Sequence, residues 1–296
     1  MIREIDSPTL DRSITLHPDE IVASLTGKRH VSWSQLSSVR GCPRKWWFSH
    51  VEGAQPAFQP AALLFGSAFH EAVQAHYRGR LEDSPPSLDE LHGVFDAAWD
   101  EQMLEAGVPV RCGARDTEGS LKDRGHSMLE AFLNSELASL GSGGEEGQLL
   151  AIEESVTGKL HPAMPTFVAR IDVIWRDSDG LHLMDLKTAR SPWSEAQAKA
   201  SSQQLRLYAR LATAITGDDP VHLHFGVVTK AKTPAVQRVD VGTVERDSEE
   251  DHHAVTRVML PVWQAMAAGV DFANPNAMNC STCPYSHICP AADGDE

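Results

Sequence analysis

Two aspartates in the middle of the chain, Asp172 and Asp185, have the setting of a paired-carboxylate site. They lie in FVARIDVIW (167–175) and LHLMDLKTA (181–189), which alternate apolar and polar residues as strands do, on either side of the turn sequence RDSDG (176–180). A hairpin that turns in the middle of RDSDG sets the two aspartates directly opposite each other on one face. Their Cβ atoms are then about 4.5–5.5 Å apart, so the carboxylates repel each other unless a cation neutralises them. Oxygen ligands of this kind suit Mg²⁺ or Mn²⁺.

The same hairpin also has an ordinary explanation. The register sets Arg170 opposite Lys187, and a solvent-exposed polar face with an ion pair between Asp172 and Lys187 would show the same alternation. A slip of one residue would break the pairing. The opposite face carries residues suited to a core, namely Ile171, Val173, Trp175, Met184 and Leu186. The hairpin alone does not decide between a metal site and a solvated face.

Cysteines form a second candidate site. NCSTCPYSHICP near the C-terminus contains Cys280, Cys283 and Cys289, one thiolate fewer than a tetrahedral S₄ site requires. Cys42, in RGCPRKWWFSH, supplies the fourth, and Cys112 is predicted to serve packing. Five cysteines in a reducing compartment are poor candidates for disulfides. Four thiolates can hold zinc or an iron–sulfur cluster, and spacing alone does not choose between them.

Periodicity of the sequence gives the elements that must position these residues. Residues 1–30 lack sustained periodicity and are predicted to form a loosely held arm. Ser32 and Ser34 are suited to cap a short helix that runs on through RGCPRKWWFSH. Further helices are predicted over 61–78, 88–105, 121–140, 194–215 and 250–268. Strands are predicted over 149–160, 167–175, 181–189, 221–230 and 235–241.

Two of these helices carry polar side chains that could join the carboxylates. In GSAFH, Gly66 lies one turn before His70, which would let a neighbouring backbone approach closely while the imidazole reaches outward. In QLRLY, Gln204 and Tyr208 are one turn apart. Taken singly, a helix histidine is usually structural and a Gln–Tyr pair is usually surface packing. Their order along the chain relative to the two aspartates makes a shared site a better explanation than it is for either motif alone.

Composition restricts the class of protein. The chain has 296 residues, 42% of them hydrophobic, and a formal net charge of −15 at pH 7. That charge excludes a broadly basic surface, so a nucleic-acid partner requires a local patch, for which Arg40, Arg44 and Lys45 are candidates. Neither a signal-peptide pattern nor the roughly 20 apolar residues of a membrane span occurs. A cytoplasmic protein is predicted.

In chain order, GxxxH, ARID, DLK and QxxxY resemble the motifs of the RecB-like branch of the PD-(D/E)XK nuclease superfamily, over roughly residues 32–290. The family usually has glycine before RID, where this chain has Ala169. Asp185-Leu186-Lys187 matches the acidic-x-lysine signature. Glu153 falls where related sequences carry a glutamate, although Glu154 leaves the register open.

The resemblance implies an α/β fold, a restriction-endonuclease-like mixed β-sheet flanked by helices. A single nuclease domain over 31–296 would follow the arm, with a helical insertion at about 81–147. A distant cysteine followed by Cx₂Cx₅C is similar to the iron–sulfur exonucleases of the same superfamily, including AddB-like domains and CRISPR-associated RecB-like exonucleases. It implies a 4Fe-4S cluster that joins the N-terminal region to segment 278–290, on Cys42, Cys280, Cys283 and Cys289.

The resemblance also implies the chemistry. His70, Asp172, Asp185 and the main-chain carbonyl of Leu186 would hold Mg²⁺ or Mn²⁺ for phosphodiester hydrolysis. Lys187 would orient the attacking water or stabilise charge on the phosphate, and Gln204 and Tyr208 would support the substrate strand. The prediction is an exonuclease on single-stranded or frayed DNA, in repair, recombination or CRISPR-type processing, with protein partners in such a complex. The alternative is a catalytically idle DNA-binding or scaffolding module.

Overall fold

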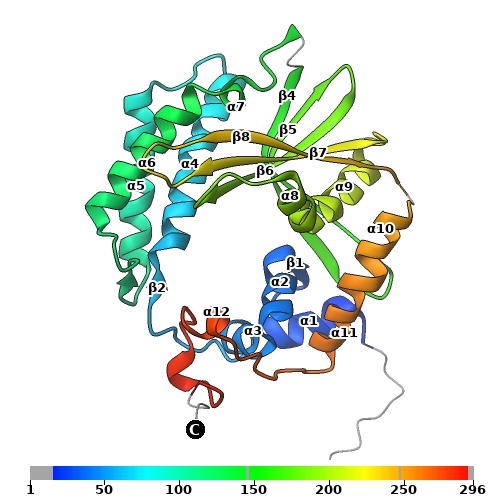
Figure 1. The fold of residues 1–296 in the computed structure, drawn as a ribbon. Coiled ribbons are helices and arrows are strands. Elements are labelled where there is room, and N and C mark those ends of the chain that lie inside the picture. The colour runs from blue at the N-terminus through cyan, green and yellow to red at the C-terminus, as the bar shows by residue number, and fades with distance from the viewer. Residues whose placement is uncertain (1–15, 145–146, 247, 293–296) are drawn as a thin grey trace, which may run out of the picture.

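The computed structural model describes residues 16–144, 147–246 and 248–292, and it has a central mixed sheet with helices on both faces (Figure 1). The strand order is β1-β5-β6-β7-β8, with β4 beside β5. The strands are β1 (His30–Ser32), β4 (Gln148–Gly158), β5 (Thr166–Asp177), β6 (Gly180–Ala189), β7 (Val221–Thr229) and β8 (Val236–Val244). The short strands β2 (Gln59–Pro60) and β3 (Val110–Arg111) pair separately. The predicted mixed α/β fold is confirmed.

The central strands are buried on both faces. In β6 every residue from Leu181 to Leu186 is buried, and β7 is buried along most of its length. The two strands run parallel to each other, and parallel strands covered on both sides lose the simple alternation of a half-exposed strand. Each face therefore has its own hydrophobic core.

One face of the sheet is covered by helices that lie between β2 and β4 in the chain. They are α4 (Ala61–Leu81), α5 (Leu88–Glu105), α6 (Glu118–Leu133) and α7 (Glu136–Ser139). Capping boxes at Ser87 and Thr117 satisfy backbone N–H groups at the starts of α5 and α6. The core beneath them includes Trp99 and Trp175, and Cys112 packs against it as predicted.

The other face is covered by helices from the N-terminal region and from the part of the chain that follows β6. They are α1 (Pro18–Thr26), α2 (Trp33–Gly41), α3 (Pro43–His50), α8 (Glu195–Ser201), α9 (Gln203–Thr216), α10 (Glu249–His253), a π-helical segment (Ala254–Met259) and α11 (Leu260–Ala267). The C-terminal helix α12 (Ala277–Cys280) and a 3-10 turn (Ser286–Ile288) lie beside α3 (Figure 1). The core on this side includes Trp46 and the apolar stripe of α9.

The N-terminal region differs from the prediction in two ways. Part of the expected arm is helix α1, because Pro18 starts it, a capping box on His17 closes its first turn and Val22 is fully buried; residues 1–15 lie outside the described residues. The predicted single helix through RGCPRKWWFSH is two helices. Cys42 has φ −159° and ψ 106°, which breaks the helix, and Pro43 then begins α3.

The β5–β6 hairpin has the predicted register and opens into a fork. Asp177 pairs with Gly180 and Val173 with Met184, and the strand ladder stops there, one position before Asp172 and Asp185. On the same edge of β5, strand β1 pairs further back, with residues 166–168. Among the described residues, 169–172 therefore have no strand partner on this edge. The fork leaves room for a polar site between β5 and β6.

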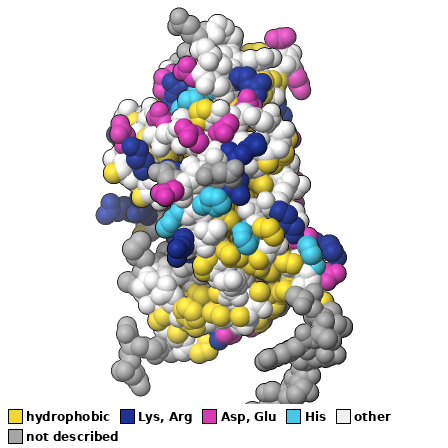
Figure 2. Space-filling model, turned by 90° about the vertical axis from the view of Figure 1, so that its right-hand side faces the viewer, with side chains coloured by type: hydrophobic (Ala, Val, Ile, Leu, Met, Phe, Trp, Pro, Cys, Tyr) yellow, Lys and Arg dark blue, Asp and Glu magenta, His cyan; other side chains and the backbone are white. Residues whose placement is uncertain are grey.

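Figure 2 shows one face of the molecule, the side that lies to the right in Figure 1. Basic and acidic side chains are intermixed on its upper part, and hydrophobic side chains gather lower down. The net negative charge is thus not spread as one acidic field over this face. Within the described residues, no helix is both long and apolar enough to span a membrane.

Candidate active site and cysteine cavity

The fork between β5 and β6 opens into a cleft of about 610 Å³. Its walls come from α4, β4, β5, β6 and α9, elements that are far apart in the chain. It is lined by all the side chains that the motifs single out: His70, Glu153, Asp172, Asp185, Lys187, Gln204 and Tyr208. Gly66 and Arg170 also line it. The four motifs meet in one place.

The two aspartates lie in a buried setting. Asp185 is 4% exposed, and its Oδ2 atom forms an ion pair with Lys187 Nζ at 2.5 Å but has no hydrogen-bond donor among the described residues. Burial, and then the Asp185 carboxylate, raise the pKa of Asp172 to about 8. The Lys187 ammonium therefore does not neutralise both carboxylates. A divalent cation would correct this deficit.

The solvated-face explanation of the hairpin is wrong. Ile174 and Leu183 alternate with Asp172 and Asp185 on the same face of the hairpin, and both are buried in the core beneath α9. Lys187 pairs with Asp185 rather than with Asp172. A buried pair of carboxylates on this face costs free energy unless it binds something.

His70 and the backbone of Leu186 lie beside Asp172. His70 Nδ1 is 3.8 Å from Asp172 Oδ2, and the Leu186 N–H donates a 2.7 Å hydrogen bond to that same carboxylate oxygen. Burial lowers the pKa of His70, which favours the neutral imidazole that can ligate a metal. Within the described part of the chain, no three His, Cys, Asp or Glu side chains are already arranged as a metal-ligand set. The candidate metal ligands therefore line one cleft, but their side chains do not form a complete coordination shell.

A chain of polar contacts runs from α9 to the carboxylates. Gln204 Nε2 donates to Tyr208 Oη at 2.9 Å, and Lys187 Nζ donates to Gln204 Oε1 at 3.4 Å. Burial raises the pKa of Tyr208 to about 12, so its hydroxyl stays protonated at neutral pH. These contacts hold the Lys187 ammonium over the cleft, next to Asp185.

Glu153 rather than Glu154 faces the cleft, which resolves the register that the sequence left open. Glu154 is exposed, whereas Glu153 pairs with Arg170 and, at 2.8 Å, with Arg78. Glu153 has φ +50°, a left-handed conformation that is uncommon for a residue other than glycine. Strain of this kind tends to collect at functional sites.

Arg78 is a cleft residue that the sequence analysis missed. Gly66, His70, Gln74 and Arg78 follow one another at intervals of four along α4, and all of them line the cleft. This spacing puts side chains on one helical face. Extending the GxxxH motif by two more turns would have found Arg78.

The expected role of Gly66 is not supported. A Cβ atom placed on Gly66 would meet only Thr188 Oγ1, at 3.8 Å, which is an ordinary contact. Within the described residues, no backbone of another element therefore approaches this glycine closely. What the missing side chain provides is open space at the rim of the cleft.

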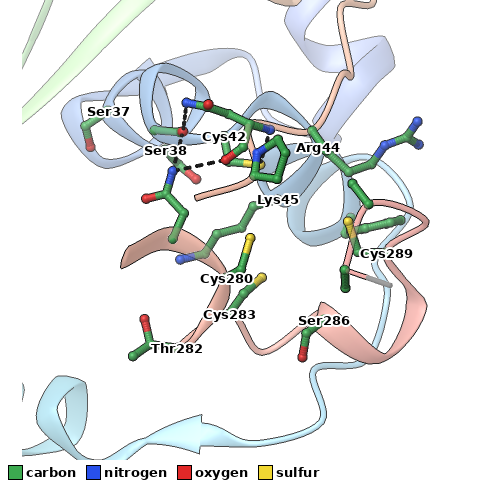
Figure 3. A pocket seen from close by; sticks show the side chains of 18 of the residues that line it. Ser37, Ser38, Cys42, Arg44, Lys45, Cys280, Thr282, Cys283, Ser286 and Cys289 are labelled. Atoms are coloured by element: carbon green, nitrogen blue, oxygen red, sulfur yellow. Dashed lines mark hydrogen bonds between the residues drawn. The ribbon is translucent and has the colours of Figure 1, made fainter. Parts of the chain in front are cut away.

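The four cysteines proposed as ligands line a second cavity, of about 360 Å³. Cys42 enters it from the junction of α2 and α3, and Cys280, Cys283 and Cys289 enter it from the C-terminal segment (Figure 3). Burial, and then the nearby Cys42 and Cys289 thiols, raise the pKa of Cys283. Four thiol side chains around one cavity fit zinc or an iron–sulfur cluster by donor type. As at the cleft, the described side chains do not close a coordination shell.

The C-terminal segment is tied to the N-terminal helices without the help of any ion. Asn274 and Asn279 donate side-chain hydrogen bonds to the Gly41 carbonyl at 3.0 and 3.1 Å, and Arg44 forms a 2.9 Å ion pair with Asp271. The Ala57 N–H donates to the Pro284 carbonyl at 2.8 Å. The last contact fixes the stretch that leads into α4, and so connects this cavity to the helix of His70.

Two comparisons concern fold and local similarity. A crystal structure described as "Putative exonuclease" from Eubacterium rectale superposes with a TM-score of 0.52 at 12% identity, covering 94% of this chain and 90% of that one, which shows a shared fold. A structure of SSO0001 has a TM-score of 0.33 at 15% identity, covering 88% and 95% of the two chains. A "Glycerol kinase" from Alkaliphilus metalliredigens (strain QYMF) is 27% identical over 109 residues, 36% of this chain, and the match spans only 22% of that protein.

The broadest match is to a family. The model of the PD-(D/E)XK nuclease superfamily matches residues 30–290, which include the cleft and the cysteine cavity. The match begins at β1 and ends just after Cys289, so it takes in both halves of the hairpin and all four motifs. This chain belongs to the PD-(D/E)XK nuclease superfamily.

Proposed function

We propose that this protein is a Mg²⁺- or Mn²⁺-dependent exonuclease of the RecB-like branch, acting on single-stranded or frayed DNA. Family membership supports a hydrolytic nuclease with DNA as its substrate, and such nucleases typically use Mg²⁺ or Mn²⁺. The observation that carries the proposal is the convergence of His70, Asp172, Asp185 and Lys187 in one cleft. A role in repair, recombination or CRISPR-type processing, with protein partners, would follow from the branch.

The residues of the cleft take distinct roles in this proposal. His70, Asp172, Asp185 and the Leu186 carbonyl would hold the cation, which supplies Lewis-acid activation of the scissile phosphate. Lys187, held by Gln204, would donate to the phosphate oxygen on which charge develops. Gln204 and Tyr208 position Lys187 and border the path of the DNA strand. Glu153 neutralises Arg78 and Arg170, and so sets how much positive charge faces the DNA.

The cysteine cavity is proposed to hold a 4Fe-4S cluster, with zinc as the alternative. Support comes from the four thiol side chains that two distant parts of the chain bring to one cavity. The cluster would add covalent closure to the hydrogen bonds that already join α2 and α3 to the C-terminal segment. Its role would be structural, because the cavity is separate from the cleft.

The direct test is to incubate anaerobically purified protein with end-labelled single-stranded DNA and Mn²⁺. Products that shorten progressively from one end support the proposal and give the polarity of cleavage. A ladder of internal fragments would replace the exonuclease by an endonuclease. Intact DNA, with binding retained, would favour the idle DNA-binding module. The buried carboxylate pair argues against that second candidate, because an idle module gains nothing from the repulsion between Asp172 and Asp185.

Lys187→Ala is expected to separate metal binding from cleavage. The variant keeps His70, Asp172 and Asp185, so Mn²⁺ should still raise its melting temperature. The cleavage rate should fall by about 100-fold or more, because a preorganised donor to the phosphate is removed. Single-turnover cleavage with saturating Mn²⁺ measures this. A normal rate would remove Lys187 from the mechanism.

A further inference from the structure

Another cavity, distinct from the cysteine cavity, adjoins the cleft, and its lining is basic. Its volume is about 590 Å³, and it lies between the start of α4, the loop 113–116, α6 and the end of β6. Four cations line it against a single carboxylate, Asp116: Arg115, Arg124, Arg190 and Lys230. In a chain with a net charge of −15, such a concentration of positive charge is a local exception.

Most of this positive charge is not neutralised by carboxylates of the described residues. Arg124 pairs with Asp116 at 3.0 Å. Among the described residues, no carboxylate lies within ion-pair distance of Arg115, Arg190 or Lys230. Lys230 instead has its Nζ atom 4.8 Å from the centre of the Phe65 ring. Burial, and then the charges of Arg124 and Arg190, lower the pKa of Lys230, and the opposing effect of Asp116 is smaller, as expected where cations outnumber anions.

The basic cavity and the cleft meet at the rim of the cleft. Thr188 and Ala189 line the basic cavity and directly follow Lys187 in β6, while Phe65 lines it and directly precedes Gly66. Thr188 Oγ1 lies 3.8 Å from the position that a Cβ atom on Gly66 would occupy. Because Gly66 has no side chain, α4 places no side-chain atoms between the two cavities at this position. Arg190 lies three residues after Lys187, about 10 Å further along the chain.

We propose that this basic cavity binds a phosphate group of the DNA strand a few nucleotides from the scissile bond, with the strand crossing the rim at Gly66. The proposal rests on the proposed function for the identity of the strand. Guanidinium groups match phosphate oxygens in pairs, and Lys230 adds a point charge above an apolar floor of Phe65 and Leu121. The phosphate is either an internal one of the backbone or one at a strand terminus.

The test measures binding without cleavage. Full-length protein carrying Asp185→Asn is titrated with a fluorescent 12-nucleotide DNA in EDTA, and anisotropy is followed at several salt concentrations. Arg190→Gln with Lys230→Gln should weaken binding by about 10-fold, and the slope of log K against log salt should fall by about 0.7 for each phosphate that the protein no longer neutralises. Arg29→Gln with Lys28→Gln is the matched control, because these residues are exposed, line none of the described cavities and change the charge equally.

The arms of the experiment separate the possible outcomes. If binding weakens equally for DNA with 5′-phosphate, 3′-phosphate and unmodified ends, the site takes an internal phosphate; weakening confined to one terminal phosphate assigns it to that end. Arg115→Gln with Arg190→Gln, both exposed, repeats the test without altering the half-buried Lys230. Affinities and salt slopes equal to those of the control would overturn the inference. Weakened binding in a protein whose parent cleaves no DNA would refute the nuclease instead and leave the phosphate site standing.

Discussion

Asp185→Asn is expected to reduce metal-dependent DNA cleavage to below about 1% of the wild-type rate while the fold survives. Asp185 is the most deeply buried carboxylate of the cleft, and its Oδ2 atom has no hydrogen-bond donor in the described part of the protein. Replacing it removes a ligand and also relieves the repulsion that raises the pKa of Asp172. The melting temperature in metal-free buffer should therefore stay the same or rise.

The matched control for Asp185→Asn is Asp179→Asn, at the exposed tip of the same hairpin. It changes the charge equally and should leave both cleavage and the stabilisation by Mn²⁺ intact. In the Asp185 variant, Mn²⁺ should no longer raise the melting temperature, because the folded state has no remaining affinity for the ion. Cleavage at half the wild-type rate or more by Asp185→Asn would contradict the assignment of the metal site.

Cys42→Ser is expected to have the largest effect on stability. Protein purified without air should be brown, with the broad visible absorbance of an iron–sulfur cluster, and this variant should lose the colour. Cys42 and the C-terminal cysteines close a long loop, from residue 42 to residue 280, so removal of the cross-link should lower the free energy of unfolding by about 3–5 kcal/mol. Activity should fall as well, because the C-terminal segment fixes the stretch leading into α4.

Cys112→Ser is the control for the cysteine cavity, since Cys112 packs against the core of α4–α7 and does not line the cavity. It should keep the colour and the iron content. Metal analysis separates the two candidate cofactors: one zinc and no iron would replace the cluster by a zinc site and leave the nuclease proposal untouched. Unchanged stability and metal content in Cys42→Ser would exclude Cys42 as a ligand.

Features that depend on neighbours in the sequence can be predicted. The turn RDSDG and the alternation on either side of it determine the hairpin register, and the structure has that register from Val173 to Met184. Periodicity predicts the helix that starts at Leu88, and the structure adds a cap at Ser87. Both depend on contacts between residues close in the chain.

Features that depend on distant segments cannot be predicted in the same way. The hairpin does not reveal that α9 covers its acidic face, or that β6 leaves β5 after Met184. Helix α1 is missed because the packing partner of Val22 is a core built from the rest of the chain. The basic cavity combines Arg115, Arg190 and Lys230 from three loops that show no common pattern in the sequence.

The hydrogen bond from the Leu186 N–H to Asp172 has a practical consequence for anyone who needs an inactive form of this protein. Asp172 completes the hairpin at the point where the strands separate, so its carboxylate takes the place of a missing main-chain acceptor. An asparagine there can turn its amide nitrogen toward the Leu186 N–H and force the strands apart, and an alanine leaves that N–H unsatisfied. Loss of activity in an Asp172 variant could thus come from a disturbed hairpin or from the loss of a metal ligand, and the two causes would not be distinguished. Crystals with uncut DNA are better sought with Asp185 replaced, because no backbone group depends on that side chain in the described structure.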